Sequence, residues 1–311
     1  MSNTPPSNKL APSPTPLWVA VIGAVAAVLA TVFNPGTPSQ HAEAMSGLVQ
    51  TTVQYLAITT VFFAVFWIAL GDRLARRRIS RKRWPKRAQV TREIVFSTAS
   101  MLIFLGVDLW VVFFNPWATS NMYTSVGQHG WLYYTMVLLL TFALHDTYFY
   151  WAHRMMHHPR LYARFHKVHH ESTDPTPFTA YSFHPLEAVM EGLAGAALIP
   201  LYIVLPWHSS IPVVWGLGQI FFNVIGHLGY EVYPSWWHRV PVLNQKTTAT
   251  HHYLHHQMVG GNYGLYFRWW DKWCGTEFKN YERKFDSLFE APADKKSPGA
   301  AGTVRAAPPA A

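Results

Sequence analysis

Long apolar runs separated by polar loops dominate the hydrophobic pattern of the chain. Several runs approach the roughly 20 residues that a helix needs to cross the ~30 Å hydrocarbon layer of a membrane. The last two contain acidic residues or prolines, so they form either full crossings or a short re-entrant hairpin. The runs cover residues 17–33, 48–70, 94–114, 131–144, 186–206 and 211–230. This pattern predicts an all-α, multi-pass membrane helical bundle with six crossings, or with four crossings and a hairpin.

The composition agrees with a membrane protein. Half of the 311 residues are hydrophobic and only 13% are charged, about half the charged share of a typical soluble protein. The first run could instead be a signal peptide, since it is short and follows polar sequence. Residues 1–16 and 286–311 are rich in Pro, Ala and Ser, so we expect disordered tails there.

A strongly basic loop orients the predicted bundle. Ten Arg or Lys residues lie between Arg73 and Arg92, whereas the loops 34–47 and 115–130 have none. By the positive-inside rule the basic loop is cytoplasmic, and counting crossings from it places both termini and residues 145–185 on the same side. Beside a membrane span such a loop indicates anionic lipid headgroups rather than nucleic acid.

The predicted domains follow from these features. The N-terminal membrane helices and the basic loop, residues 72–93, fall within residues 17–130, and a second domain covers residues 131–285. The single cysteine, Cys274, excludes an intramolecular disulfide and any Cys-rich metal or iron–sulfur site. Neither a Gly-rich phosphate loop nor a dinucleotide fingerprint is visible, so any electrons must come from another protein.

Three histidine boxes carry the candidate chemistry. Fourth-neighbour histidines share one face of a helix, and third- and fourth-neighbour spacings together let three rings converge. Burying so many imidazoles without a ligand would be costly. Eight histidines exceed the four ligands of one tetrahedral ion, so the boxes predict two metal ions. Their members are His153, His157, His166, His169, His170, His252, His255 and His256.

Four further residues are candidates near the boxes. His184 and His227 each stand at the predicted cytoplasmic end of an apolar run, where they could complete the two ligand shells. Asp146 lies nearly two helical turns before His153, so its carboxylate could accept the outer N–H of that ring and fix its tautomer. Glu231 could do the same or bind metal directly.

The sequence resembles the fatty acid hydroxylase and sterol desaturase family of integral membrane oxygenases. The family pattern HxxxH, HxxHH and HxxHH falls on the three boxes. The surrounding sequence matches as well: HD-x4-W-x-HR at 145–154, TPFTAYSFHPLEA at 176–188, HLGYE at 227–231, and HHYLHH followed by GNYG and WWDKWCGT at 251–276. In some relatives a second histidine stands where this chain has Glu231.

The resemblance implies a membrane helical bundle with a cytosolic, histidine-rich dimetal cap. It further implies two iron ions, with zinc possible in purified protein, and dioxygen as co-substrate. We expect hydroxylation or desaturation of a lipid, namely a sterol-like ring, a fatty acyl chain or an aminolipid. An electron donor such as a ferredoxin, or cytochrome b5 with its reductase, would be needed. The membrane would be the bacterial inner membrane or the endoplasmic reticulum.

Two other functions are compatible with the boxes. Zinc also binds imidazole, so a membrane zinc hydrolase is one alternative. Against it, the chain lacks HExxH, because Arg154 stands where that motif has its glutamate. A non-catalytic metal transporter is the other. Transporters place polar ligands near the bilayer midplane, whereas these boxes lie at the ends of runs.

Overall fold

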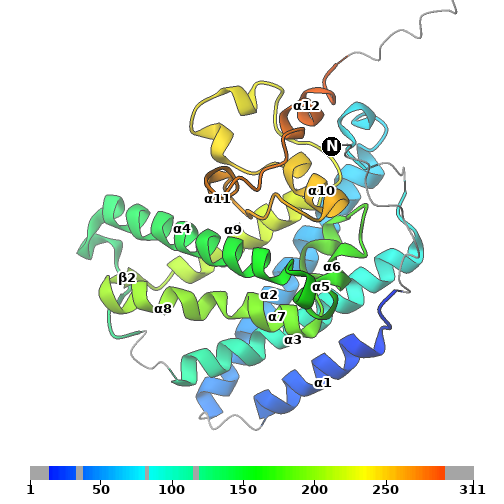
Figure 1. The fold of residues 1–311 in the computed structure, drawn as a ribbon. Coiled ribbons are helices and arrows are strands. Elements are labelled where there is room, and N and C mark those ends of the chain that lie inside the picture. Colours follow the sequence, from blue (N-terminus) through cyan, green and yellow to red (C-terminus); the bar gives the residue numbers. More distant parts are fainter. Residues whose placement is uncertain (1–13, 33–37, 81–83, 115–118, 291–311) are drawn as a thin grey trace, which may run out of the picture.

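The structure of the protein is a computed structural model that describes residues 14–32, 38–80, 84–114 and 119–290. Over these residues the chain is mostly helical, as predicted (Figure 1). The only two strands in the described ranges form a short parallel pair. Most of the predicted tails, residues 1–13 and 291–311, lie outside the described residues.

The N-terminal half contains three long helices. Helix α1 packs against α3, and α2 crosses both α3 and the later helix α9. The tyrosine Tyr55 on α2 is buried against η5, where its hydroxyl donates to the Phe178 carbonyl oxygen. The elements are α1 (Trp18–Val32), α2 (Pro38–Phe63), η1 (Ala64–Ala69), η2 (Ala75–Arg77) and α3 (Arg87–Phe114).

The middle of the chain forms a helical layer beside the first three helices. Helix α4 lies against α8, and both run toward the end of the molecule at the left of Figure 1. At that end β1 pairs with β2, which joins the loop after α3 to the turn between α8 and α9. The elements are β1 (Met122–Tyr123), η4 (Val126–Gln128), α4 (Gly130–Met156), α5 (Pro159–Phe165), α6 (Lys167–His170), η5 (Pro177–Tyr181), α7 (Pro185–Gly192), α8 (Ala194–Val204), β2 (Trp207–His208) and α9 (Ile211–Gly226).

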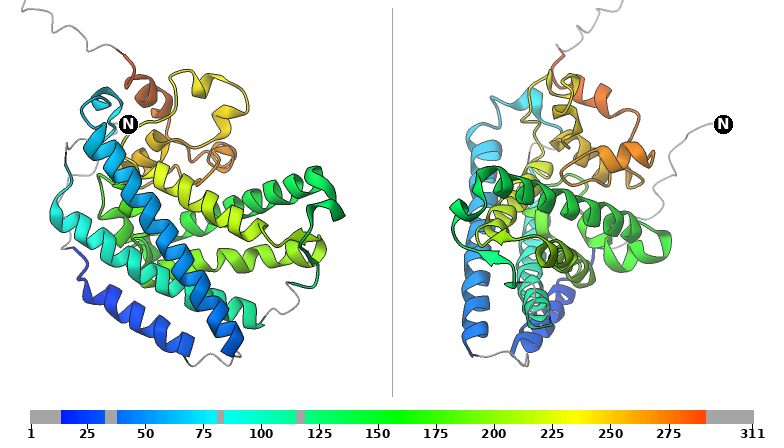
Figure 2. Two further views of the ribbon diagram at one scale, coloured as in Figure 1. Left: turned by 180° about the vertical axis from the view of Figure 1, so that it is seen from behind. Right: turned by 90° about the vertical axis from the view of Figure 1, so that its left-hand side faces the viewer.

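The C-terminal elements gather on the opposite side of the bundle, next to the end of α9 (Figure 2). They are η6 (Trp237–Arg239), η7 (Leu243–Gln245), α10 (Ala249–Met258), α11 (Trp269–Trp273) and α12 (Tyr281–Asp286). Leu288 is only 8% exposed and packs with Ile79, so the start of the predicted C-terminal tail is part of the core. Likewise Thr15, in the predicted N-terminal tail, donates to the Glu171 carboxylate.

Three helical segments in the described part of the chain are long and apolar enough to cross a membrane: Val49–Ala69, Arg87–Val111 and Pro185–Val204. The runs at 17–33 and 211–230 form the shorter apolar helices Trp18–Leu29 and Ile211–Gly226. The run 131–144 lies inside α4, whose exposed side carries Leu132, Leu139 and Leu144. The predicted number of crossings stays a prediction.

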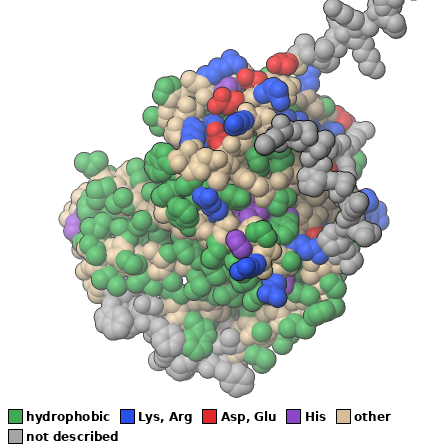
Figure 3. All heavy atoms as spheres, viewed as in Figure 1, with side chains coloured by type: hydrophobic (Ala, Val, Ile, Leu, Met, Phe, Trp, Pro, Cys, Tyr) green, Lys and Arg blue, Asp and Glu red, His purple; other side chains and the backbone are tan. Residues whose placement is uncertain are grey.

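The surface separates into two regions. Charged side chains gather over the upper part in Figure 3, where α10 and α12 lie, whereas hydrophobic side chains cover much of the region around α4 and α8. The basic segment lies with the first region, because its backbone bonds the chain just after α9, beside His227: Ile79 N donates to Gly229 O, and Glu231 N donates to Arg77 O. The basic loop and the histidine boxes therefore occupy the same end of the molecule.

Candidate metal centre

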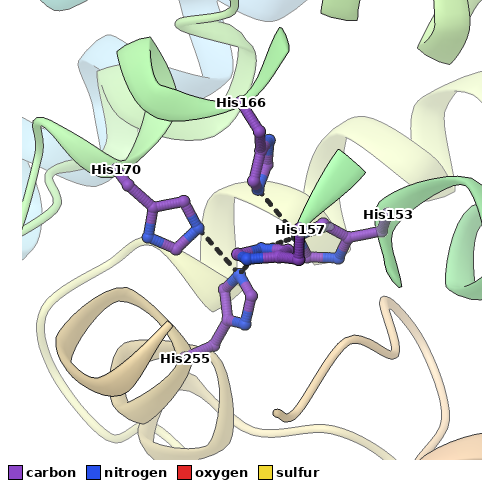
Figure 4. Close-up of side chains that lie close together, drawn as sticks. All are labelled: His153, His157, His166, His170 and His255. Atoms are coloured by element: carbon purple, nitrogen blue, oxygen red, sulfur yellow. Dashed lines mark hydrogen bonds between the residues drawn. The ribbon is translucent and has the colours of Figure 1, made fainter. Parts of the chain in front are cut away.

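The ring nitrogens of nine histidines converge in two adjacent groups. Within each group one nitrogen from every ring lies within 4.8 Å of all the others. The first group contains His153, His157, His166, His170 and His255, whose rings point toward one another in Figure 4. The second group contains His169, His227, His252 and His256. Every box histidine, and the additional candidate His227, is thus in one of the two groups.

The helix boundaries explain how short spacings in sequence produce this convergence. His153 is on the last turn of α4, and His157 is the residue that ends the helix. Pro159 then begins α5 at its first position, which reverses the chain over one short helix. His166 lies between α5 and α6, so the second box folds back onto the first. The third box is on α10, which reaches the same point from the C-terminal side (Figure 4).

The separations of the Nε2 atoms match neighbouring ligands of one ion. In the first group His153 and His166 are 2.9 Å apart, and His170 and His255 are 3.0 Å apart. In the second group His252 lies 2.9 Å from His227. With metal–nitrogen bonds of about 2.1 Å, adjacent ligands of an octahedral ion are about 3.0 Å apart, and those of a tetrahedral ion about 3.4 Å.

Backbone carbonyls fix the tautomers of several rings. A carbonyl oxygen can only accept, so the Nδ1 of His153, 2.9 Å from the Tyr263 carbonyl, carries the ring proton. The same holds for His255, whose Nδ1 is 2.7 Å from the Gly261 carbonyl. A neutral imidazole has one N–H, so the Nε2 atoms of both rings present bare lone pairs to the centre of the first group.

A buried carboxylate fixes a third ring in the same way. The Nδ1 of His166 donates to the carboxylate of Glu187 on α7, so the Nε2 of His166 also presents a lone pair to that of His153. Lone pairs that face each other repel unless a cation lies between them. The donor set of each group therefore fits a metal ion with imidazole ligands, such as iron or zinc.

The electrostatics of the site favour neutral rings. Burial lowers the pKa of His153 to about 4, and burial together with the nearby His153 lowers that of His157 to about 2. Burial and then the neighbouring histidines lower the remaining box pKa values well below the usual range, in His166, His169, His170, His252, His255 and His256. At neutral pH these rings are imidazoles, the form that binds metal.

The sequence analysis did not assign a site role to Glu187. Its side chain is fully buried. The signal available in the sequence was an acidic residue within an otherwise largely apolar run, because an ionisable residue in such a run is usually functional. The contact with His166, 21 positions earlier, could not be read from spacing.

Asp146 does not have the predicted role. Its carboxylate accepts from the backbone N–H groups of Tyr266, at 2.6 Å, and Phe267, at 3.3 Å, while the His153 ring bonds Tyr263. Asp146 thus anchors the segment after α10 to α4. The predicted alignment on the α4 face was not enough, because a backbone segment occupies the position beside the His153 ring.

Glu231 and His184 lie outside both groups. Glu231 accepts from the backbone N–H and the hydroxyl of Thr250, at 2.9 and 2.7 Å, so it holds the first turn of α10. His184 precedes α7, where its Nδ1 accepts from the Leu186 N–H and caps the helix. Both residues position elements that carry the site, and neither contributes a nitrogen or oxygen to the described groups.

A small cavity adjoins both groups. His153 and His166 from the first group line it, as do His169, His227 and His252 from the second. The rest of the lining is largely apolar or acidic: Phe149, Phe183, Glu187, Glu191 and Asn223. The two groups therefore border the same small cavity.

Comparisons with known proteins agree with this site. Residues 138–276 match the model of the fatty acid hydroxylase family, and they include all nine converging histidines. The C-4 methylsterol oxidase of Schizosaccharomyces pombe is 33% identical over 60% of this chain and 63% of its own. The Delta(7)-sterol 5(6)-desaturase of Aspergillus fumigatus is 30% identical over 55% and 57%.

Lathosterol oxidase of Rattus norvegicus is 30% identical over 62% of each chain. The chain thus spans about three fifths of the length of these curated relatives. No solved structure matches it at comparable significance. Residues 138–276 thus match the fatty acid hydroxylase family, and the relatives that the chain resembles are sterol desaturases and methylsterol oxidases.

Proposed function

We propose that the protein is a membrane oxidoreductase that hydroxylates or desaturates a C–H bond of a lipid with dioxygen. The observation that carries this proposal is the pair of adjacent groups of neutral histidines, which share one cavity at the end of apolar helices. A zinc hydrolase of the HExxH type would need a glutamate as general base at the position of Arg154. Instead that side chain donates to the Tyr150 hydroxyl.

Each group would hold one iron ion. The first ion would take the five histidines of the first group and the second ion the four of the second group, and zinc could replace either in purified protein. When bound, two reduced irons would supply the redox chemistry that oxidation of an unactivated C–H bond by dioxygen requires.

The role of this chain's other residues is to prepare those ligands. The carbonyls of Tyr263 and Gly261 and the carboxylate of Glu187 hold the Nδ1 protons, so the Nε2 lone pairs stay directed inward. Such partners raise the basicity of a ligand and fix its orientation. Phe149 and Phe183 line the cavity with apolar surface, which excludes water from the reaction space.

The overall reaction consumes electrons that the chain does not store. Hydroxylation takes one dioxygen, two electrons and two protons per C–H bond and releases one water, whereas desaturation releases two waters. A ferredoxin, or cytochrome b5 with its reductase, would supply the electrons. We place the boxes, the basic loop and both termini on the cytoplasmic side of a bacterial inner membrane or of the endoplasmic reticulum.

The preferred substrate class is a sterol-like lipid. The names of the relatives place their reactions at carbon 4 and at the 5(6) bond of a sterol. A sterol carries its hydroxyl on carbon 3, so in both cases the reacting carbons lie close to that hydroxyl. A fatty acyl chain and a bacterial aminolipid are the alternatives.

Lipid mass spectrometry tests the proposal. Lipid extracts are compared from cells with the protein, without it, and with the His255→Ala variant, each grown with and without oxygen. We expect an oxygen-dependent lipid that has gained one oxygen or lost two hydrogens only with the intact protein. Its absence from every lipid class, in cells that hold metal-loaded protein and a competent reductase, would overturn the proposal.

A further inference from the structure

We propose that the carboxyl of Glu191 binds a hydroxyl group of the lipid and sets which carbon faces the histidines. This inference rests on the proposed function and adds a substrate requirement to it. The lipid would carry a hydroxyl within a few bonds of the reacting carbon.

Glu191 lies in the reaction space itself. It lines the small cavity together with His153 and His166, and it follows Glu187 by four residues on α7. Residues four apart share a helix face and are displaced by about 6 Å along the axis. One carboxyl on this face therefore holds a histidine of the first group, and the next lies one turn farther along the cavity wall.

The Glu191 carboxyl has no hydrogen-bond donor among the described residues. Three tyrosines, Tyr148, Tyr181 and Tyr266, are close enough to interact with it electrostatically, and all three hydroxyls have other hydrogen-bond partners; that of Tyr266 is the Nδ1 of His145, 2.9 Å away. Tyr148 donates to the Met190 carbonyl at 2.7 Å, and Tyr181 donates to Gln219. A carboxyl removed from bulk water is costly unless it is paired, so a donor from a bound molecule would satisfy it.

The neighbours of Glu191 indicate what that molecule is. Phe149 and Phe183 offer apolar surface beside the carboxyl, and the segment Pro185–Val204, which contains Glu191, is long and apolar enough to cross a membrane. A ligand that arrives through the bilayer and presents one hydroxyl among carbon atoms fits this combination. A sterol has that form, whereas the middle of an unsubstituted acyl chain has no donor for Glu191.

The opposite face of α7 offers a matched control. Leu186 and Val189 face away from the cavity and line an apolar groove with Gly23 and Gly106 of α1 and α3. A Val189→Leu substitution changes α7 on that side without touching the reaction space. It therefore tests whether altering α7 alone disturbs activity.

The experiment uses metal-loaded, full-length protein with a reductase and a carrier. The probes are a Δ7-sterol with a free hydroxyl, the methyl ether of the same sterol, and a C18 fatty acid. We expect the intact protein to convert the free sterol roughly 10- to 100-fold more efficiently than the ether, as expected for one hydrogen bond to a carboxylate. Glu191→Leu should remove that preference with two metal ions still bound, whereas Val189→Leu should keep it.

The outcomes separate this inference from the proposed function. Equal conversion of sterol and ether by the intact protein, an unchanged preference in Glu191→Leu, or conversion of the fatty acid alone would overturn the role of Glu191 and leave lipid oxidation standing. Loss of metal from Glu191→Leu would also overturn it, because the residue would then support the metal site. No oxygen-dependent conversion of any probe or cellular lipid would overturn both.

Discussion

The Nδ1 atom of His166 donates a hydrogen bond to the carboxylate of Glu187. This contact joins the second histidine box to α7, a helix within an apolar segment long enough to span a membrane. It leaves the Nε2 lone pair of His166 directed at the Nε2 of His153, 2.9 Å away. The first histidine group is thus bonded directly to the apolar segment that contains α7.

The first prediction concerns the nine converging histidines. An Ala substitution at any of the eight box positions, or at His227, should abolish turnover and lower bound metal, because each removes one ligand nitrogen. Ala at His129 or His208, which lie at the other end of the bundle, should change neither. Metal analysis and lipid turnover of the purified variants check this. Near-normal turnover in two or more of the nine would contradict the ligand assignment.

Glu187 should matter for metal affinity. In Glu187→Leu the His166 ring loses the partner that fixes its tautomer, so we expect metal affinity to fall roughly 10- to 100-fold. Competition with a chelator measures the change. Glu191→Leu removes a carboxyl one turn away and is the matched control, with unchanged affinity expected. An equal loss in both variants would contradict a specific role of the contact between Glu187 and His166.

The topology can be tested by cysteine labelling. In a Cys274→Ser background, a cysteine at Arg164 should be protected in intact cells, whereas one at Ser125 should react with an impermeant reagent. Both positions are exposed, and they lie at opposite ends of the bundle. We expect this labelling pattern because the positive-inside rule places the loop from Arg73 to Arg92 on the cytoplasmic side. Labelling of Arg164→Cys from outside would show that the protein has the opposite orientation to the predicted one.

Electron transfer from an acidic carrier should depend on salt. The face near the boxes has exposed Arg160 and Arg164 beside the half-buried His157, so attraction should steer the carrier, and added salt should slow turnover. Reversing both charges to Glu should raise the KM for the carrier. Turnover driven by a small uncharged reductant is the control, and its rate should not change with added salt or with the charge reversal. A salt-independent rate with the carrier would refute steering.

Lys246 should make stability pH-dependent. Burial lowers its pKa from 10.5 to about 7, with the nearby Asp146 acting in the opposite direction. Between these two pH values the unfolded chain binds more protons than the folded one, so the free energy of unfolding should rise with pH. The Lys246→Met variant has no ionisable group at this position. Its advantage in melting temperature over the natural chain should therefore be largest below pH 7 and shrink toward pH 10.5.

A constant difference between Lys246→Met and the natural chain would contradict that interpretation. The comparison of two chains that share every other group isolates Lys246 together with Asp146, whose pKa Lys246 lowers, because the titration of groups that do not interact with Lys246 cancels. A Lys272→Met variant is a useful second control, because it removes another lysine whose pKa is lowered by burial. In contrast to Lys246, the side chain of Lys272 contacts Gln245 at the exposed surface.

The sequence by itself determined the helical membrane class and selected the nine histidines of the two groups, together with His184, which lies outside them. Apolar runs near the length of a membrane crossing leave few alternatives to helices, because hydrocarbon cannot satisfy backbone hydrogen bonds. The spacings of His153 with His157 and of His252 with His255 and His256 are local, and a helix fixes local geometry. His227 could also be selected, because it ends an apolar run close to the boxes.

Only the tertiary structure decided how those ligands divide and what supports them. His169 and His170 are adjacent in sequence yet belong to different groups, because successive side chains on a helix point about 100° apart, toward different neighbours. Glu187 reaches His166, Asp146 holds the segment at Tyr266, and Glu231 holds Thr250. Each of these carboxyls lies close to a candidate ligand in sequence or on a helix face. Its partner comes from another element, so only the packing of the helices could assign its role.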